Sequence, residues 1–160
     1  MPANEYALPP ALVPPTAVAD TQLTISAWGQ LIFQARGLTQ TLEVIQAAMQ
    51  QERDAYGELL DLSNPAFRKY QSRITCTDVR VPPFDALWPG MVVDVGCAAF
   101  LCYPVGNPGS PAREEVSGSS FVANGSVFYR PLLTMMITAI SWQREEWKAN
   151  QPWTFSLAER

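Results

Sequence analysis

The feature that most constrains this fold is residues 126–142, SVFYRPLLTMMITAISW, the longest apolar run in the chain. Side chains of an extended strand alternate between its two faces. One face here would carry Phe128, Leu132, Met136, Ile140 and Trp142, and the other Tyr129, Leu133, Met135, Ile137 and Ala139. Both sets are apolar, so the run predicts a central β-strand that is covered on both faces.

Turn signals flank this run on both sides. Asn124-Gly125 stands directly before it, and this pair is the strongest short-range signal for a β-hairpin. A second run, Trp147 to Leu157, follows a polar tetrad at residues 143–146. We therefore expect a hairpin partner on each side of the central strand. Pro131 opposes a helix over the first part of the run, whereas a helix from Leu132 onward is the alternative.

Further strands are predicted along the rest of the chain, with turn signals between them. They cover residues 21–28, 31–35, 58–62, 66–77 and 91–103. Residues 66–77 place Tyr70, Ser72, Ile74 and Cys76 on one face, and residues 91–103 do the same for Val93, Val95, Cys97, Ala99 and Leu101. Short strands at this spacing predict an all-β sandwich or barrel of antiparallel strands. We expect residues 21–160 to form a single β domain.

Residues 38–50 are ambiguous between helix and strand. Leu38, Leu42, Ile45 and Met49 recur at helical spacing, which favours a helix over residues 41–54. The β-branched Thr39, Thr41 and Val44 favour a strand instead. The pattern of residues alone predicts a helix over residues 41–54, with a strand as the alternative.

Two segments are predicted to lie outside the strands. Residues 1–20 form an extended N-terminal arm, because Pro9, Pro10, Pro14 and Pro15 favour polyproline geometry. The arm is either a disordered leader or a segment that lies along a neighbouring subunit, with apolar anchors at Tyr6, Leu8, Leu12 and Val13. Residues 104–120 form a loop of about 17 residues, which is long enough to be functional or mobile.

Charge and cysteine content restrict the partners. The net charge of −4 gives no basic stripe for nucleic acid. No stretch is long enough to span a membrane and no signal peptide is evident, so we expect folding in the cytoplasm. Cys76, Cys97 and Cys102 lack the second pair of ligands that a zinc site needs. Cys76 and Cys97 could form a disulfide if their strands pair, although buried thiols are favoured.

The sequence contains no histidine, which removes the common routes to an activated nucleophile or general base. A hydrolase built on two carboxylates is what remains, with candidates at Asp54, Glu58, Asp61, Glu114, Glu115, Glu145 and Glu146. Nothing in the spacing shows that two of them converge. We therefore expect a protein that is not an enzyme and takes no cofactor or metal.

Aromatic residues and two arginines are the other candidates. Tyr129, Trp142, Trp147, Trp153 and Phe155 could form a sugar-stacking platform, although alternating aromatics more often line a core or a subunit interface. Arg36 and Arg130 are flanked by apolar residues. Each is expected to play a structural role, in a buried ion pair or against a neighbouring subunit.

Four short strings carry a family resemblance: 35-ARGLTQTL-42, 67-FRKY-70, 87-LWPG-90 and 128-FYRP-131. Together they resemble a family of minor virion proteins encoded among the tail genes of tailed bacteriophages and prophages. The resemblance runs from about Trp28 to Glu159. It implies an all-β fold, an extended segment after RGLTQTL and no catalytic residues. The Pro-rich leader departs from the family pattern.

The resemblance implies a non-enzymatic structural subunit of a virion, assembled in the host cytoplasm and placed at the tail tip or baseplate. Its partners would be other phage tail proteins and copies of itself in a trimeric or hexameric ring, without nucleic acid or membrane. Expected interface residues are Leu8, Leu12, Val13, Arg36, Trp88, Tyr129 and Arg130. The alternatives are a carbohydrate- or receptor-binding β module that uses the tryptophans, and a head–tail connector or capsid-surface protein.

Overall fold

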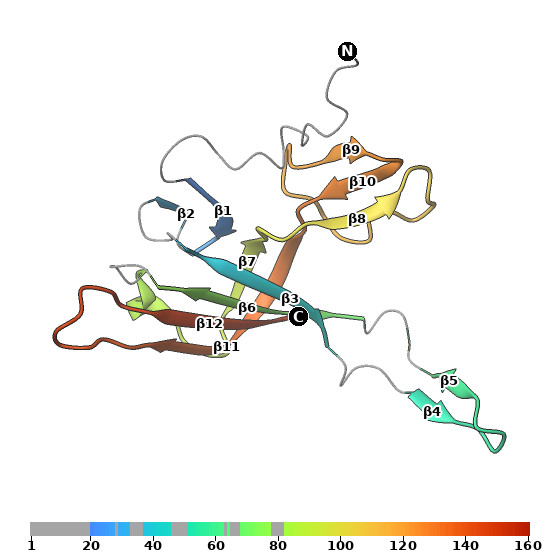
Figure 1. Ribbon diagram of the computed structural model, residues 1–160, viewed down its shortest axis with the longest axis horizontal. Coiled ribbons are helices and arrows are strands. Elements are labelled where there is room, and N and C mark those ends of the chain that lie inside the picture. The colour runs from blue at the N-terminus through green and yellow to red at the C-terminus, as the bar shows by residue number, and fades with distance from the viewer. Residues whose placement is uncertain are drawn as a thin grey trace, which may run out of the picture.

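The computed structural model describes residues 20–27, 29–32, 37–45, 51–62, 64, 68–77 and 82–160. These residues form three antiparallel sheets, which confirms the all-β prediction (Figure 1). The strands are β1 (Asp20–Ile25), β2 (Gly29–Ile32), β3 (Thr39–Val44), β4 (Gln51–Arg53), β5 (Leu59–Asp61), β6 (Tyr70–Cys76), β7 (Val92–Gly96), β8 (Leu101–Pro104), β9 (Phe121–Ala123), β10 (Ser126–Tyr129), β11 (Leu132–Trp142) and β12 (Trp153–Glu159).

The main sheet has seven strands in the order β2-β1-β7-β11-β12-β6-β3 and curls into a half-barrel. Alternate apolar residues of its strands meet on the inner face, as the period of two requires. This core includes Leu23, Ile25, Ile74, Cys76, Val93, Val95, Leu133, Met135, Ile137, Trp153, Phe155 and Leu157. The core faces predicted for residues 70–76 and 93–97 are therefore confirmed.

Strand β11 is central, as predicted, and it lies between β7 and β12. The prediction that both of its faces are covered is wrong. Leu133, Met135 and Ile137 are buried, whereas the alternate residues Thr134, Met136 and Thr138 are exposed. The open half-barrel explains this, since its outer face meets solvent. The alternative of a helix from Leu132 onward is also wrong.

The hairpin signal Asn124-Gly125 is confirmed, but the hairpin lies in a different sheet from the one expected. Both residues have positive φ, 51° and 72°, and they join β9 to β10. Strands β8, β10 and β9 form a separate three-stranded sheet. Arg130 and Pro131 then carry the chain from β10 into β11, so β10 does not pair with the central strand.

A β-bulge at Thr138 reverses the facing of the last residues of β11. Ile137 pairs with Leu157 and Ala139 with Ser156, which leaves Thr138 as an extra residue. Ile140 then pairs with the buried Phe155, and Trp142 pairs with the buried Trp153. Ile140 and Trp142 therefore turn towards the inner face, together with Ile137 and not with Met136 as simple alternation predicts.

Three other boundaries differ from the expectations. The strand predicted over residues 91–103 is divided into β7 and β8, which belong to different sheets. Residues 39–44 form the edge strand β3 and residues 51–53 form β4, so the helix predicted over residues 41–54 is wrong at these positions; residues 46–50 lie outside the described part of the chain. Strand β2 begins at Gly29, before the predicted start at residue 31, and the turn that precedes it includes Ser26 and Ala27.

Strands β4 and β5 form the third sheet, a two-stranded hairpin. In Figure 1 it extends away from the main sheet. Asp54 organises its turn, because its carboxylate accepts hydrogen bonds from the backbone N–H groups of Tyr56 and Glu58 at 2.8 and 2.9 Å. Gly57, at φ 83°, supplies the left-handed residue that the turn requires.

Candidate functional site

A groove rich in aromatic and proline side chains lies at one end of the half-barrel. It has a volume of about 620 Å³. One wall comes from the 3₁₀ helix η4 (Phe84–Ala86) and its neighbours, and the other from the end of β11. Its lining residues are Pro82, Pro83, Phe84, Asp85, Leu87, Trp88, Pro89, Ile140, Trp142 and Gln151.

Phe84 anchors the groove to the core. Its ring stacks on Trp142 with a centroid distance of 5.7 Å and meets the edge of Trp153 at 5.6 Å. Phe84 and Leu87 are each only 6% exposed. The buried pair fixes the short η4 segment on the sheet, so the groove is held by packing of the core.

Two tryptophans of the groove remain open to solvent. Trp88 is 69% exposed and Trp142 is 56% exposed. Large exposed aromatic surface is favourable to bury, and indole rings stack well on sugar rings, on proline rings and on other aromatics. Asp85 and Gln151 are the polar side chains of the lining. The groove can therefore bind a mainly apolar ligand that offers a few hydrogen-bonding groups.

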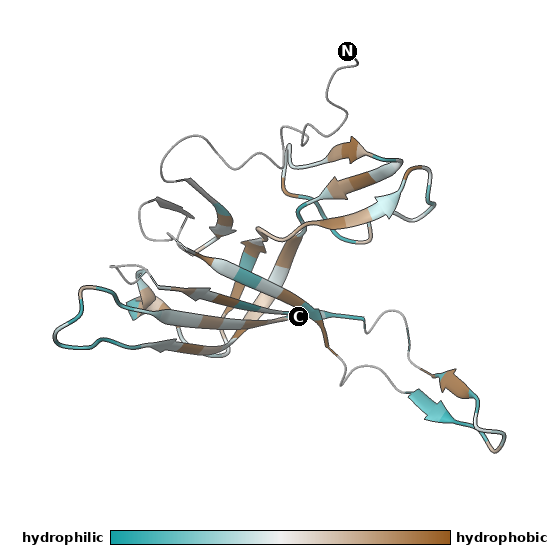
Figure 2. Cartoon of the chain, viewed as in Figure 1, coloured by the Kyte–Doolittle hydropathy of each residue, from teal (hydrophilic) through white to brown (hydrophobic). Residues whose placement is uncertain are grey.

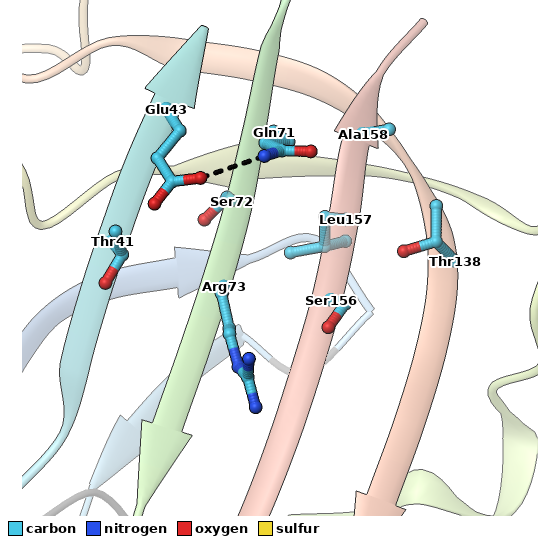
Figure 3. A pocket seen from close by; sticks show the side chains of 9 residues that line it. All are labelled: Thr41, Glu43, Gln71, Ser72, Arg73, Thr138, Ser156, Leu157 and Ala158. Carbon is cyan, nitrogen blue, oxygen red and sulfur yellow. Dashed lines mark hydrogen bonds between the residues drawn. The ribbon is translucent and has the colours of Figure 1, made fainter. Parts of the chain in front are cut away.

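A second hollow lies on the outer face of strands β3, β6, β12 and β11 (Figure 3). Its side chains are mostly small and polar, including Thr41, Thr138 and Ser156, and Gln71 donates a hydrogen bond to Glu43 at 2.9 Å. Arg73 is the cation of this lining. Small polar side chains are typical of a sheet face in contact with solvent, and this hollow lacks the aromatic walls of the groove.

The interface residues that the sequence predicts differ in their exposure and position in the structure. Trp88 lies in the aromatic groove, where a partner could reach it. Tyr129 is 3% exposed and its ring meets Tyr103, so little of it remains for a neighbouring subunit. Leu8, Leu12, Val13 and Arg36 lie outside the described residues.

Arg130 connects parts of the chain that are distant in sequence. Its guanidinium donates a hydrogen bond to the Gln22 carbonyl of β1, and its backbone N–H donates to the Ser119 hydroxyl at 3.1 Å. Burial lowers the pKa of Arg130 from its usual value. Its expected structural role is consistent with these contacts within one chain.

The long loop of residues 105–120 is attached to the main sheet at several points. Arg113 forms an ion pair with Glu159 at 2.7 Å, and its guanidinium lies over the Tyr70 ring at 5.5 Å. The backbone of Val116 bonds to Arg130, and the Glu114 carbonyl accepts from Leu132. These contacts argue against the expectation that the loop is mobile.

Three of the candidate carboxylates have structural partners. Asp54 orders its turn, Asp61 pairs with Arg68 at 3.4 Å, and Glu145 pairs with Lys148 at 2.7 Å. Glu115 takes part in a β-bridge with Pro131, which is a contact of the backbone. The contacts of Asp54, Asp61 and Glu145 account for these three carboxylates as surface and turn residues.

The cysteines and aromatics are likewise distributed between core and surface. Cys76 and Cys97 are buried thiols that do not form a disulfide, and Cys102 is exposed. Burial raises the pKa of the Cys97 thiol to about 11, against a smaller lowering by a hydrogen bond with Gln40. Trp153 and Phe155 are in the core, whereas Trp147 is 94% exposed in the turn after β11. The five aromatics therefore do not form one platform.

The groove was only partly foreseeable from the sequence. Trp88 was named as an interface residue, but Phe84 and Gln151 were not. The density of proline and aromatic residues between Pro82 and Pro89 was the available signal. Gln151 reaches the groove only through the β11–β12 pairing, which local pattern does not reveal.

Comparisons with known proteins give no relative: no family model, no curated protein and no solved structure matches this chain. Across the described ranges, no helix has the length and apolar character needed to cross a membrane.

Proposed function

We propose that this protein is a structural subunit of a bacteriophage virion, a minor tail protein at the tail tip or baseplate, that assembles with copies of itself. The observation that carries the assembly part is the exposed apolar strand β5. The placement in a phage tail is supported by the resemblance of the strings in residues 35–42, 67–70, 87–90 and 128–131.

Strand β5 and its flanks expose large apolar side chains. Leu59, Leu60 and Leu62 are 54%, 42% and 55% exposed, and Tyr56 at the turn is 95% exposed. Figure 2 shows the contrast between the hydrophobic β5 and the hydrophilic β4. Such an apolar strand is a template for pairing with another chain, and proteins that stay monomeric protect such strands.

The β4–β5 hairpin, with its apolar strand β5, favours a subunit that pairs with other copies. The described part of β5 pairs with β4, and the apolar side chains lie on a hairpin instead of in the core. A hairpin that inserts against a different surface of the next copy gives a heterologous contact, and repeated contacts of this kind form a ring where the rotation between copies closes. A trimeric or hexameric tail component would need such a contact.

The assembly claim is tested by the native mass of the full chain and of a Leu60→Lys variant, measured by light scattering after size exclusion. We expect the wild type at a discrete multiple of 17.7 kDa and the variant at the mass of the monomer, because the substitution weakens every equivalent contact. Val122→Lys is the matched control, because Val122 is 65% exposed on the separate three-stranded sheet. A monomeric wild type, or equal loss in both variants, contradicts the role of β5.

The virion claim is tested by quantitative mass spectrometry of purified phage particles from a host that carries this sequence. We expect a fixed copy number per particle that survives salt and detergent washing. Absence from washed particles overturns the placement.

The groove favours a second candidate, a carbohydrate- or receptor-binding β module. Trp88 and Trp142 supply the stacking surface, and Asp85 and Gln151 supply hydrogen-bonding groups. Protection of these tryptophans from an aqueous quencher by cell-wall oligosaccharides, with loss in Trp88→Ala, would support it.

A further inference from the structure

We infer that the aromatic groove is the docking site for the Pro-rich N-terminal segment of a neighbouring copy of this chain. The occupant is residues 8–15, LPPALVPP, in polyproline II conformation. This inference deepens the proposed function, since it assigns one further contact between subunits. The contact between this segment and the groove is separate from the contact proposed for β5.

The chemistry of the groove matches this occupant. Polyproline II segments dock into grooves walled by aromatic and proline side chains, where they lose little conformational entropy. Trp88 and Trp142 are the open aromatic walls, and Pro82, Pro83 and Pro89 contribute further apolar surface. Few polar groups line the groove, which fits proline rings better than a sugar with many hydroxyls.

The sequence of the segment is apolar on every side of such a helix. Polyproline II has three residues per turn, so residues three apart share a face. One face would carry Leu8, Ala11 and Pro14, and the next Pro9, Leu12 and Pro15. Between Tyr6 and Ala19 the chain carries no charged side chain, so docking brings no charge into the groove.

The register of the sheet favours a neighbouring copy over the same molecule. Thr24 and Leu132 both pair with Gly96, so they lie at one level of the sheet. The arm joins β1 at Asp20, before that level, whereas Trp142 lies ten residues beyond it on β11. The arm therefore starts at the end of the sheet opposite the groove.

The test places a photo-crosslinking benzoylphenylalanine at position 12 of the full chain, in place of Leu12. Equal amounts of ¹⁴N- and ¹⁵N-labelled protein are mixed, dissociated together and allowed to reassemble, and are then irradiated and analysed by mass spectrometry. We expect cross-links to residues 82–89 or 140–142, with mixed-isotope pairs among them. Cross-links confined to other regions, or pairs only within one chain, overturn the inference.

Two variants make the result specific. Trp88→Ala is expected to lower the yield of groove cross-links about tenfold, as for a central aromatic contact. Trp147→Ala is the matched control, because Trp147 is 94% exposed but outside the groove, and it should leave the yield unchanged. Equal yields in both variants contradict the assignment.

The outcome is separable from the proposed function. Leu60→Lys tests assembly through β5, and the cross-link tests only the arm and the groove. A wild type that assembles with no groove cross-link removes this inference and leaves the proposed function standing. Protection of Trp88 and Trp142 by an oligosaccharide, with no groove cross-link from the arm, assigns the groove to a sugar instead and also overturns it.

Discussion

The side chain of Gln40, on edge strand β3, accepts a hydrogen bond of 2.7 Å from the backbone N–H of Ala98, just after β7. The same oxygen accepts a hydrogen bond from Ala99 at 3.2 Å, and the amide nitrogen donates to Ser72 at 3.0 Å. Strands β3 and β7 are separated by three strands within the sheet. One glutamine therefore ties the edge of the half-barrel to a loop beyond its centre.

Gln40→Leu should lower the free energy of unfolding by about 2–3 kcal/mol, because two part-buried N–H groups lose their acceptor. Urea unfolding measures this as a lower midpoint with an unchanged slope. Gln71→Leu is the matched control, since Gln71 bonds Glu43 on the exposed face, and it should change stability by less than about 0.5 kcal/mol. Equal effects of the two substitutions would show that Gln40 does not close the half-barrel.

Gly96 is required where β1, β7 and the long loop meet. An added Cβ would overlap the Thr24 hydroxyl and lie 3.1 Å from a methyl group of Val116. Gly96→Ala should cost about 1–3 kcal/mol through overpacking. Thr24→Ala in the same chain should recover part of this loss, giving a coupling of about 0.5–3 kcal/mol in a double-mutant cycle. Strict additivity of the two changes would place the strain elsewhere.

The burial of Cys97 predicts a loss of stability in alkaline solution. Its folded pKa is raised to about 11 from 9.0, mainly by desolvation. The unfolded chain releases this proton first as pH rises, so stability is full below pH 9 and declines as pH passes through 11. A shift of this size corresponds to about 2–3 kcal/mol.

Cys97→Ala isolates this effect from other alkaline titrations. The variant should unfold at lower urea near pH 7 because of the lost side chain, and the difference from wild type should shrink between pH 9 and 11. Arg130 and Glu159 act on the same thiol and remain in both proteins. A difference that stays constant with pH would mean that Cys97 does not titrate in this range.

The sequence predicted the strands whose alternation is uninterrupted and missed what breaks that alternation. Ser72, Ile74, Val93 and Val95 were placed correctly, because a period of two assigns a face directly. The bulge at Thr138 cannot be read from composition, since it depends on which residues of β12 stand opposite. The same holds for the groove, where Trp88 was locally visible but Gln151 and Ile140 reach it only through pairing across the hairpin.

That dependence makes the bulge testable in its own right. Thr138→Ala should change stability by less than about 0.5 kcal/mol, because the side chain is exposed on the outer face. Deletion of Thr138 removes the extra residue, so Ala139 follows Ile137 directly and the pairs Ile140–Phe155 and Trp142–Trp153 are kept. Ile140 and Trp142 should therefore still face inward, and Trp142 should keep its stack on Phe84.

Tryptophan fluorescence and urea unfolding measure both changes in the same samples. Both variants should match the wild type in emission wavelength and in quenching by acrylamide. Because the residues after the bulge keep their facing, the deletion should also keep the cross-link from position 12. A deletion variant whose emission moves to longer wavelength and whose quenching increases would show that the inward facing of Ile140 and Trp142 depends on the extra residue.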